Sequence, residues 1–212
     1  MNFNLLKNGI DSLKQAENSI DENYMNYEFE SFQLKDGLFN FIHGFEILSK
    51  YIIRKNNEEG IIKNKFIRRF RIAKDKEFSM GKNALEIDEG IQTISVSDAL
   101  DILYSEYRLN DNLFNNVKYL IKKRNSLMHY TIEMNEGEKD DFVQILRETI
   151  EMSIDYFNEL SWEFKHSFLE HEREFPFTEF DEWEQKAIDA DESRNEEDYI
   201  EYLIEEGIKH LK

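Results

Sequence analysis

The chain has no cysteine, a single proline and no long apolar run. Without cysteine it can form neither disulfides nor thiolate-based catalytic and metal sites. No stretch approaches the ~20 apolar residues that a membrane-spanning helix needs, so we expect no membrane partner. The sequence starts Met-Asn-Phe-Asn-Leu-Leu-Lys and lacks the basic and apolar regions of a signal peptide. The cytoplasm is therefore the expected compartment.

The scarcity of proline and glycine favours long helices. Among 212 residues there are one proline and eight glycines, with 40% hydrophobic and 34% charged residues. Apolar residues recur at the three- and four-residue spacing of a helix face, which predicts an all-α bundle. The Ser95–Asp98 stretch has the pattern of a helix N-cap. The expected helices are about 3–27, 34–55, a short helix from about 97 followed by 111–129, and 139–171.

Residues 56–95 interrupt this pattern and are predicted to form an insertion between the second and third helices. Residues 66–73 fit one helix face, whereas 86–94 fit a short strand or an extended loop. Residues 50–82 carry eleven Lys and Arg against four Asp and Glu. The insertion could thus supply a local basic site, although a basic, solvated face is the competing interpretation.

The negative charge is concentrated at the C-terminal end. Residues 1–132 carry 19 basic and 19 acidic side chains, whereas residues 133–212 carry 8 and 26 and hold the whole net charge of −18. This argues against nucleic-acid binding over the full surface but leaves room for a local site. Residues 173–212 are acidic yet rich in aromatics, so we expect a helical extension. It either packs on the bundle or mimics the charge of RNA over the basic site.

The stretch most suggestive of chemistry is residues 122–130, Lys-Lys-Arg-Asn-Ser-Leu-Met-His-Tyr. An arginine can hold a phosphate through a fixed fork of donors, and a histidine can move protons near neutral pH. Arg124 and His129 are therefore the two groups needed to cleave RNA without a metal ion. Asn125 and His129 are four residues apart and are neighbours on the surface if the helix persists.

Arg124 also lies on the apolar line of its helix, seven residues after Val117 and four before Met128. A guanidinium on an inward stripe is costly unless an anion meets it. That anion can be a bound phosphate. The simpler interpretation is a core arginine paired with a structural carboxylate, beside a histidine that caps the helix end.

Two stretches together resemble the HEPN superfamily. Residues 124–129, Arg-Asn-Ser-Leu-Met-His, match its R-x4–6-H signature, with a polar residue directly after the arginine. Residues 41–50, Phe-Ile-His-Gly-Phe-Glu-Ile-Leu-Ser-Lys, are similar to its second helix. In that helix a small residue, a glutamate and a lysine four residues later recur within an apolar run. The matches stand in the expected order, and the resemblance covers roughly residues 1–170.

The resemblance implies an all-α, HEPN-like antiparallel helical bundle over residues 1–172; the acidic helical extension expected over 173–212 falls outside it. Such proteins dimerise so that the motifs of two subunits share one cleft. The active members are metal-independent endoribonucleases, and many act as toxins or in defence against phage. The implied partners are an RNA substrate, a second copy of the chain and an antitoxin or defence-system protein. No cofactor and no metal are implied.

Carried over by position, Arg124 and His129 would be the catalytic pair, and Asn125 would position the substrate. Glu46 would be a helix-two partner near them, supported by Lys50 one turn along. The residues that would contact the RNA are Lys122, Lys123 and Tyr130. DNA lacks the attacking 2′-hydroxyl, so RNA specificity would follow from the reaction itself.

One position departs from the family pattern. Some HEPN toxins carry a tyrosine two residues after the histidine as the target of a modifying antitoxin. Here Tyr130 follows His129 directly and Thr131 takes the expected place, so silencing by that modification is not predicted. The alternative function is a non-catalytic HEPN module that binds RNA, a nucleotide or a partner protein. His166 and His171 lie among carboxylates but show no recognised metal-ligand spacing.

Overall fold

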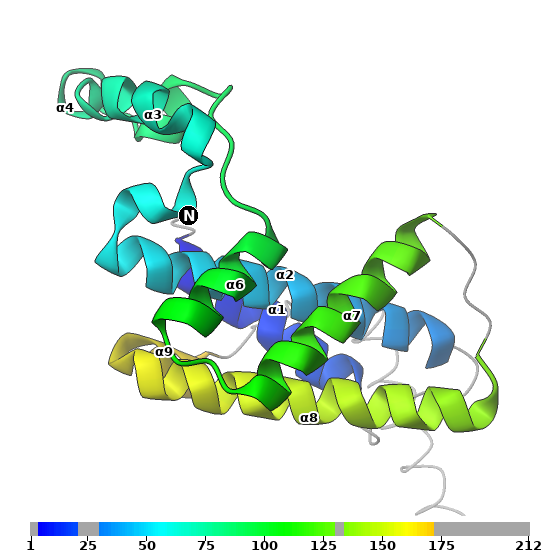
Figure 1. The fold of residues 1–212 in the computed structure, drawn as a ribbon. Coiled ribbons are helices and arrows are strands. Elements are labelled where there is room, and N and C mark those ends of the chain that lie inside the picture. Colours follow the sequence, from blue (N-terminus) through cyan, green and yellow to red (C-terminus); the bar gives the residue numbers. More distant parts are fainter. Residues whose placement is uncertain (1–3, 21–29, 130–133, 172–212) are drawn as a thin grey trace, which may run out of the picture. The chain divides into compact units, whose positions relative to one another are not determined.

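The computed structural model describes residues 4–20, 30–129 and 134–171, and every regular element in these ranges is helical. The predicted all-α class is confirmed (Figure 1). In chain order the elements are α1 Leu5–Ser19, α2 Glu30–Asn56, the 3-10 helices η1 Glu58–Ile61 and η2 Asn64–Phe66, α3 Ile67–Lys74, α4 Glu77–Met80, α5 Ala84–Ile87, α6 Val96–Glu106, α7 Asp111–His129, α8 Glu136–Leu160 and α9 Trp162–Glu170.

Helix α2 lies at the centre of the bundle and contacts α1, α6, α7 and α8. Its buried face carries Phe41 and Phe45, which are fully enclosed. The Phe45 ring packs 5.5 Å from the ring of Phe157 on α8, and Phe157 lies 5.6 Å from Phe164 on α9. These aromatic contacts join three helices that are far apart in sequence, and such pairs add to the free energy gained from burying the rings.

Helices α1 and α2 approach each other closely at two glycines. A Cβ atom added to Gly44 would lie 2.9 Å from the backbone nitrogen of Leu13 and 3.1 Å from the carbonyl oxygen of Gly9. A Cβ atom on Gly9 would lie 2.7 Å from the Leu48 side chain. The small residue in the family-like stretch of α2 therefore has a packing reason: only glycine allows the two backbones to come this near.

The prediction of one continuous helix over residues 139–171 is wrong. The structure has two helices there, because the chain turns at Ser161, which adopts an extended conformation at φ −145° and ψ 114°. The Ser161 hydroxyl accepts a hydrogen bond from the backbone N–H of Phe164 and so caps α9. The apolar spacing continues across the break, and for that reason the pattern alone did not reveal it.

The start of α9 is tied to the end of α2 by an ion pair between Glu163 and Lys55, at 2.7 Å. The hydrogen bond from Lys55 lowers the pKa of Glu163 from its ordinary 4.5 to about 2, with help from the Glu163 backbone N–H and the Ser161 hydroxyl. A carboxyl group whose pKa is depressed on folding stabilises the fold above its unfolded pKa. That contribution is lost as the pH falls from about 4.5 through 2.

We therefore expect Glu163→Gln to flatten the acid limb of the stability profile. The wild type should lose free energy of unfolding faster than the variant between pH 5 and pH 2, and the two curves should converge near pH 2. Urea unfolding at half-unit pH steps measures this directly. Parallel curves across that range would show that the ion pair contributes nothing, as many exposed pairs do.

The insertion follows the end of α2 and contains α3, α4 and α5. It does not form the short strand considered for residues 86–94: α5 occupies the first part, and the rest is extended, with one antiparallel bridge between Ile62 and Thr93. Backbone hydrogen bonds join Lys63 N–H to Gln92 and Ile94 N–H to Ile61. The chain thus enters and leaves the insertion through two paired segments.

The predicted cap of the next helix is confirmed. Ser95 accepts from the backbone N–H of Asp98, and the Asp98 carboxylate accepts in return from Ser95, which makes a capping box. The first predicted helix ends at Ser19, before residues 21–29, which lie outside the described residues. The acidic extension 173–212 also lies outside them, so its helical character and the domain division stay predictions. No described helix is long and apolar enough to cross a membrane.

Candidate functional site

The apolar stripe of α7 places Arg124 where the helix leaves the core. Leu113, Val117 and Leu120 are completely buried, whereas Arg124 is half-buried and Met128 is 54% exposed. The stripe predicted from spacing is therefore real but runs out of the core after Ile121. Arg124 therefore lies at the boundary between the buried and the exposed part of the α7 stripe.

No carboxylate among the described residues lies within ion-pair distance of Arg124. Its contact there is a weak one, from Nη1 to the sulfur of Met128 at 3.5 Å. The simpler interpretation made from the sequence, a structural arginine paired with a carboxylate, thus finds no such partner in this part of the chain. A half-buried guanidinium without an anion keeps its fork of donors available to a phosphate.

The neighbours of Arg124 present further polar groups at the same end of α7. Lys122 and Asn125 are exposed. Lys123 is half-buried, and its ammonium lies 5.4 Å from the centre of the Tyr119 ring, a cation–π contact. Lys122, Lys123 and Arg124 therefore place three successive cations near the end of α7. Such a cluster attracts polyanions.

His129 is the last residue of α7, five positions after Arg124. The helix therefore persists far enough to make Asn125 and His129 neighbours one turn apart, as predicted. The side chain of His129 and the whole of Tyr130 lie outside the described residues. Their predicted roles stay predictions.

The structure pairs Glu46 and Lys50 with each other and not with Arg124. Lys50 Nζ donates to Glu46 Oε1 at 2.6 Å and to Thr93 Oγ1 at 3.0 Å. The Lys50 side chain is only 13% exposed. Within one chain these two residues therefore fasten the returning segment of the insertion to α2, a role that the family-like spacing did not reveal.

Lys50→Met should loosen this fastening, since it keeps the length of the side chain but removes the ammonium from a half-buried carboxylate. We expect a loss of about 1–2 kcal/mol in the free energy of unfolding. Hydrogen exchange should also quicken at the Lys63 and Ile94 amides. Lys82→Met, at an exposed lysine, is the control and should stay within about 0.5 kcal/mol. Equal behaviour of the two variants would contradict the assigned role.

The basic residues of 50–82 divide into two groups. Six of the eleven cations in residues 50–82 form ion pairs. Among the described residues the other five have no carboxylate partner at ion-pair distance. The paired cations are Lys50, Arg54, Lys55, Arg69, Arg71 and Lys74, and the others are Lys63, Lys65, Arg68, Lys76 and Lys82. Three of the paired cations belong to α2; within the insertion itself three of eight are paired, so only part of the predicted basic site is neutralised.

Two of the paired arginines make two-pronged contacts. Arg69 donates through Nε and Nη2 to Asp88, and Arg71 donates in the same way to Glu59 at 2.7 and 2.6 Å. These hydrogen bonds raise the pKa of both guanidinium groups and lower the pKa of Asp88 and Glu59. The pairs join α3 to the end of α5 and to η1.

His166 of α9 and His171, which follows the helix, contact different carboxylates. His166 Nε2 lies 3.3 Å from Glu170, and His171 Nε2 lies 3.2 Å from Asp11 on α1. No group of three His, Asp or Glu side chains in the described part of the chain is arranged to hold a metal ion.

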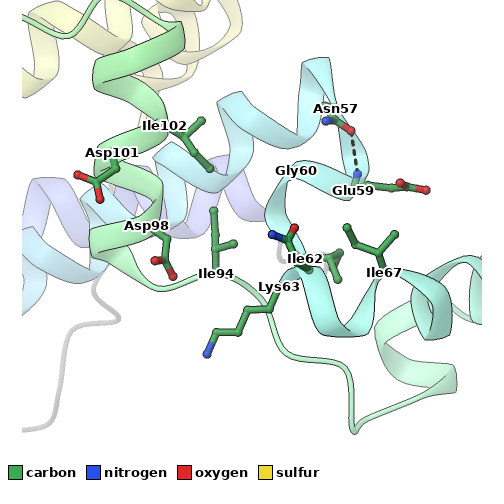
Figure 2. Close-up of a pocket in the computed structure, with 11 residues that line it drawn as sticks. Asn57, Glu59, Gly60, Ile62, Lys63, Ile67, Ile94, Asp98, Asp101 and Ile102 are labelled. Atoms are coloured by element: carbon green, nitrogen blue, oxygen red, sulfur yellow. Dashed lines mark hydrogen bonds between the residues drawn. The ribbon is translucent and has the colours of Figure 1, made fainter.

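A cavity of about 500 Å³ opens between the insertion and α6 (Figure 2). Its lining comes from two segments, residues 57–67 and 94–102. Four isoleucines form its apolar wall, and the polar groups include Lys63 and Asp101. Sequence reasoning missed this site because no spacing joins the two segments; the pairing of Ile62 with Thr93 brings them together.

No family model matches the chain, and no curated protein and no solved structure matches it either.

Proposed function

We propose that the protein is a metal-independent endoribonuclease that acts as a homodimer, with a role as a toxin or in defence against phage. One observation carries the proposal: Arg124 emerges half-buried from the core with no carboxylate partner among the described residues. In the same chain, six of the eleven cations in residues 50–82 form ion pairs. The HEPN-like R-x4-H spacing and the persistence of α7 to His129 support it further.

The chemistry follows from two groups. The 2′-hydroxyl of RNA attacks the adjacent phosphorus, the bond from phosphorus to the 5′-oxygen breaks, and a 2′,3′-cyclic phosphate and a 5′-hydroxyl remain. His129 accepts the proton of the attacking hydroxyl, and a second imidazolium protonates the leaving 5′-oxygen. Each proton transfer is worth ~10²–10⁴ in rate. Arg124 holds the non-bridging oxygens as negative charge develops on them.

A second copy of the chain would supply the second imidazole. The apolar stripe of α7 continues to the surface through half-buried Leu127 and exposed Met128, beside Arg124. Packing two such helix ends together would bury this stripe and place two Arg124–His129 sets in one groove. Lys122 and Lys123 would line the groove and make RNA binding salt-dependent.

The alternative is a non-catalytic module that binds RNA, a nucleotide or a partner protein through the same groove. It is favoured by the net charge of −18 and by the ion pairs that engage six of the eleven cations in residues 50–82. Such a module would bind without cleaving.

Incubating the purified protein with total RNA in EDTA decides between the two. The nuclease should produce fragments that end in 2′,3′-cyclic phosphate and begin with 5′-hydroxyl. Cleavage that stops when EDTA is added would overturn the metal-independent reaction. Intact RNA in both conditions, together with a measurable binding constant, would favour the module. The mass of the protein in solution tests the dimer separately.

A further inference from the structure

The cavity between the insertion and α6 has the size and lining of a small-ligand site. Its volume of about 500 Å³ falls within the range of ~300–1,000 Å³ that is usual for such sites. Ile62 and Ile67 form its wall on the insertion side, and Ile94 and Ile102 form it on the α6 side. Ile67 and Ile102 are half-buried, whereas Ile62 and Ile94 are buried, so the apolar surface open to a ligand is limited and suits a small, flat, weakly polar body such as a nucleobase.

The charges around the cavity leave one carboxylate without a partner. Glu59 is bound by Arg71. Asp98 accepts from Ser95 in the capping box, and its pKa is lowered first by these hydrogen bonds and also by the charge of Lys63. Asp101, one turn further along α6, is exposed, and its carboxylate has no hydrogen-bond or ion-pair partner among the described residues. The two carboxylate oxygens of Asp101 are therefore available as hydrogen-bond acceptors at the edge of the cavity.

Figure 2 shows how these groups lie. Asp98 and Asp101 project from α6, and Lys63 extends from the facing segment of the insertion. The Lys63 ammonium forms no ion pair with a described carboxylate, so it is available to bind an anionic group of a ligand. A ligand that fits must combine two adjacent hydrogen-bond donors, an apolar flat body and a negative charge.

We propose that this cavity binds a guanine nucleotide. Guanine is the common nucleobase with two adjacent donors, N1–H and the N2 amino group, and a carboxylate accepts both at once. Adenine and cytosine present a ring acceptor beside the amino group, which the carboxylate of Asp101 repels, and uracil has a single donor. The phosphate of the nucleotide lies on Lys63, and the isoleucines cover the faces of the base.

The guanine nucleotide bound in the cavity is one residue of a single-stranded RNA. Lys65 and Arg68 are exposed, lack ion-pair partners among the described residues, and follow Lys63 within one to two helical turns. The ring of Phe66 lies 4.8 Å from Lys65 Nζ and 5.8 Å from the guanidinium carbon of Arg69. They continue the cationic path beyond the cavity, which a free mononucleotide would not need. This part rests on the proposed function, whereas the guanine site itself does not.

The test uses the full chain with Arg124→Ala, so that RNA stays intact. Binding of GMP, AMP, CMP and UMP is followed by heteronuclear NMR on the amides of residues 57–67 and 94–102. GMP should bind about tenfold more tightly than the others, and Asp101→Asn should bring that ratio close to one. Glu106→Gln, an exposed carboxylate at the end of the same helix, is the matched control and should leave the preference unchanged.

A second arm uses ten-nucleotide RNAs with and without one central guanosine. The guanosine RNA should bind more tightly than GMP, and Lys65→Ala with Arg68→Ala should lower its affinity to that of GMP. Equal binding of all four mononucleotides, or a preference that survives Asp101→Asn, overturns the guanine site. If GMP binds but the guanosine RNA binds no more tightly than GMP, single-stranded RNA is not the ligand, and the guanine site alone stands. RNA cleavage by the wild type is read separately, so loss of either proposal is distinguishable from loss of the nuclease.

Discussion

Arg124→Ala is expected to lower RNA cleavage by about 10²–10³-fold while the protein stays folded. The guanidinium sits where the α7 stripe leaves the core and has no carboxylate to release among the described residues, so its removal should cost little stability. What it removes is the fork of donors that holds the non-bridging oxygens as charge develops. Initial rates on a labelled RNA, with circular dichroism and thermal unfolding, measure both quantities.

Two further variants give this experiment its specificity. Arg124→Lys keeps the charge but not the two-pronged geometry and should recover only a small part of the rate. Lys118→Ala removes one cation from an exposed position of the same helix and should change the rate less than about threefold. If Arg124→Ala cleaves as fast as Lys118→Ala, the arginine does not touch the reacting phosphate, and the proposed function fails.

Gly44→Val should lower the free energy of unfolding by about 3 kcal/mol, since overpacking at a close helix contact forces the backbones apart. Its Cβ atom would lie 2.9 Å from the backbone nitrogen of Leu13 and 3.1 Å from the carbonyl oxygen of Gly9. These are backbone atoms, which cannot rotate away as a flexible side chain can. Urea unfolding of the two proteins measures the difference.

Gly137→Ala is the matched control, because a Cβ atom there would meet only the Asn135 side chain at 3.5 Å. Alanine in the first turn of α8 should leave stability unchanged or raise it by about 0.4–1 kcal/mol. Gly44→Ala should fall between the control and Gly44→Val. A Gly44→Val protein as stable as the wild type would mean that α1 and α2 are not held at this separation in solution.

The high helix content and the start of α6 could be predicted directly from the sequence. The three- and four-residue spacing located α2, α6 and α7, and the Ser95–Asp98 pattern predicted a capping box that the structure contains. These features are local: each depends on residues within one or two turns. The position of Arg124 on the apolar line was also predictable, because the stripe that carries it is regular from Leu113 onward.

The break at Ser161 is a local feature that the apolar spacing concealed, because the pattern continues across the serine cap. Features that depend on distant residues could not be predicted. The neutralisation of the insertion needs Arg69 to meet Asp88 and Arg71 to meet Glu59, partners 19 and 12 residues away. The cavity needs both sides of the insertion to meet at the Ile62–Thr93 bridge. In each case tertiary packing, and not spacing, made the contact.

That bridge has a consequence for how the chain can vary. Ile62 and Thr93 are side by side, and Lys50 clamps the returning segment to α2, so the ends of the intervening polypeptide are already brought together. The entropy of closing that loop changes only slowly with its length. The bundle can thus accommodate insertions of different length at this point, and the proposed guanine site can change with them while the proposed reacting groups at the end of α7 stay the same.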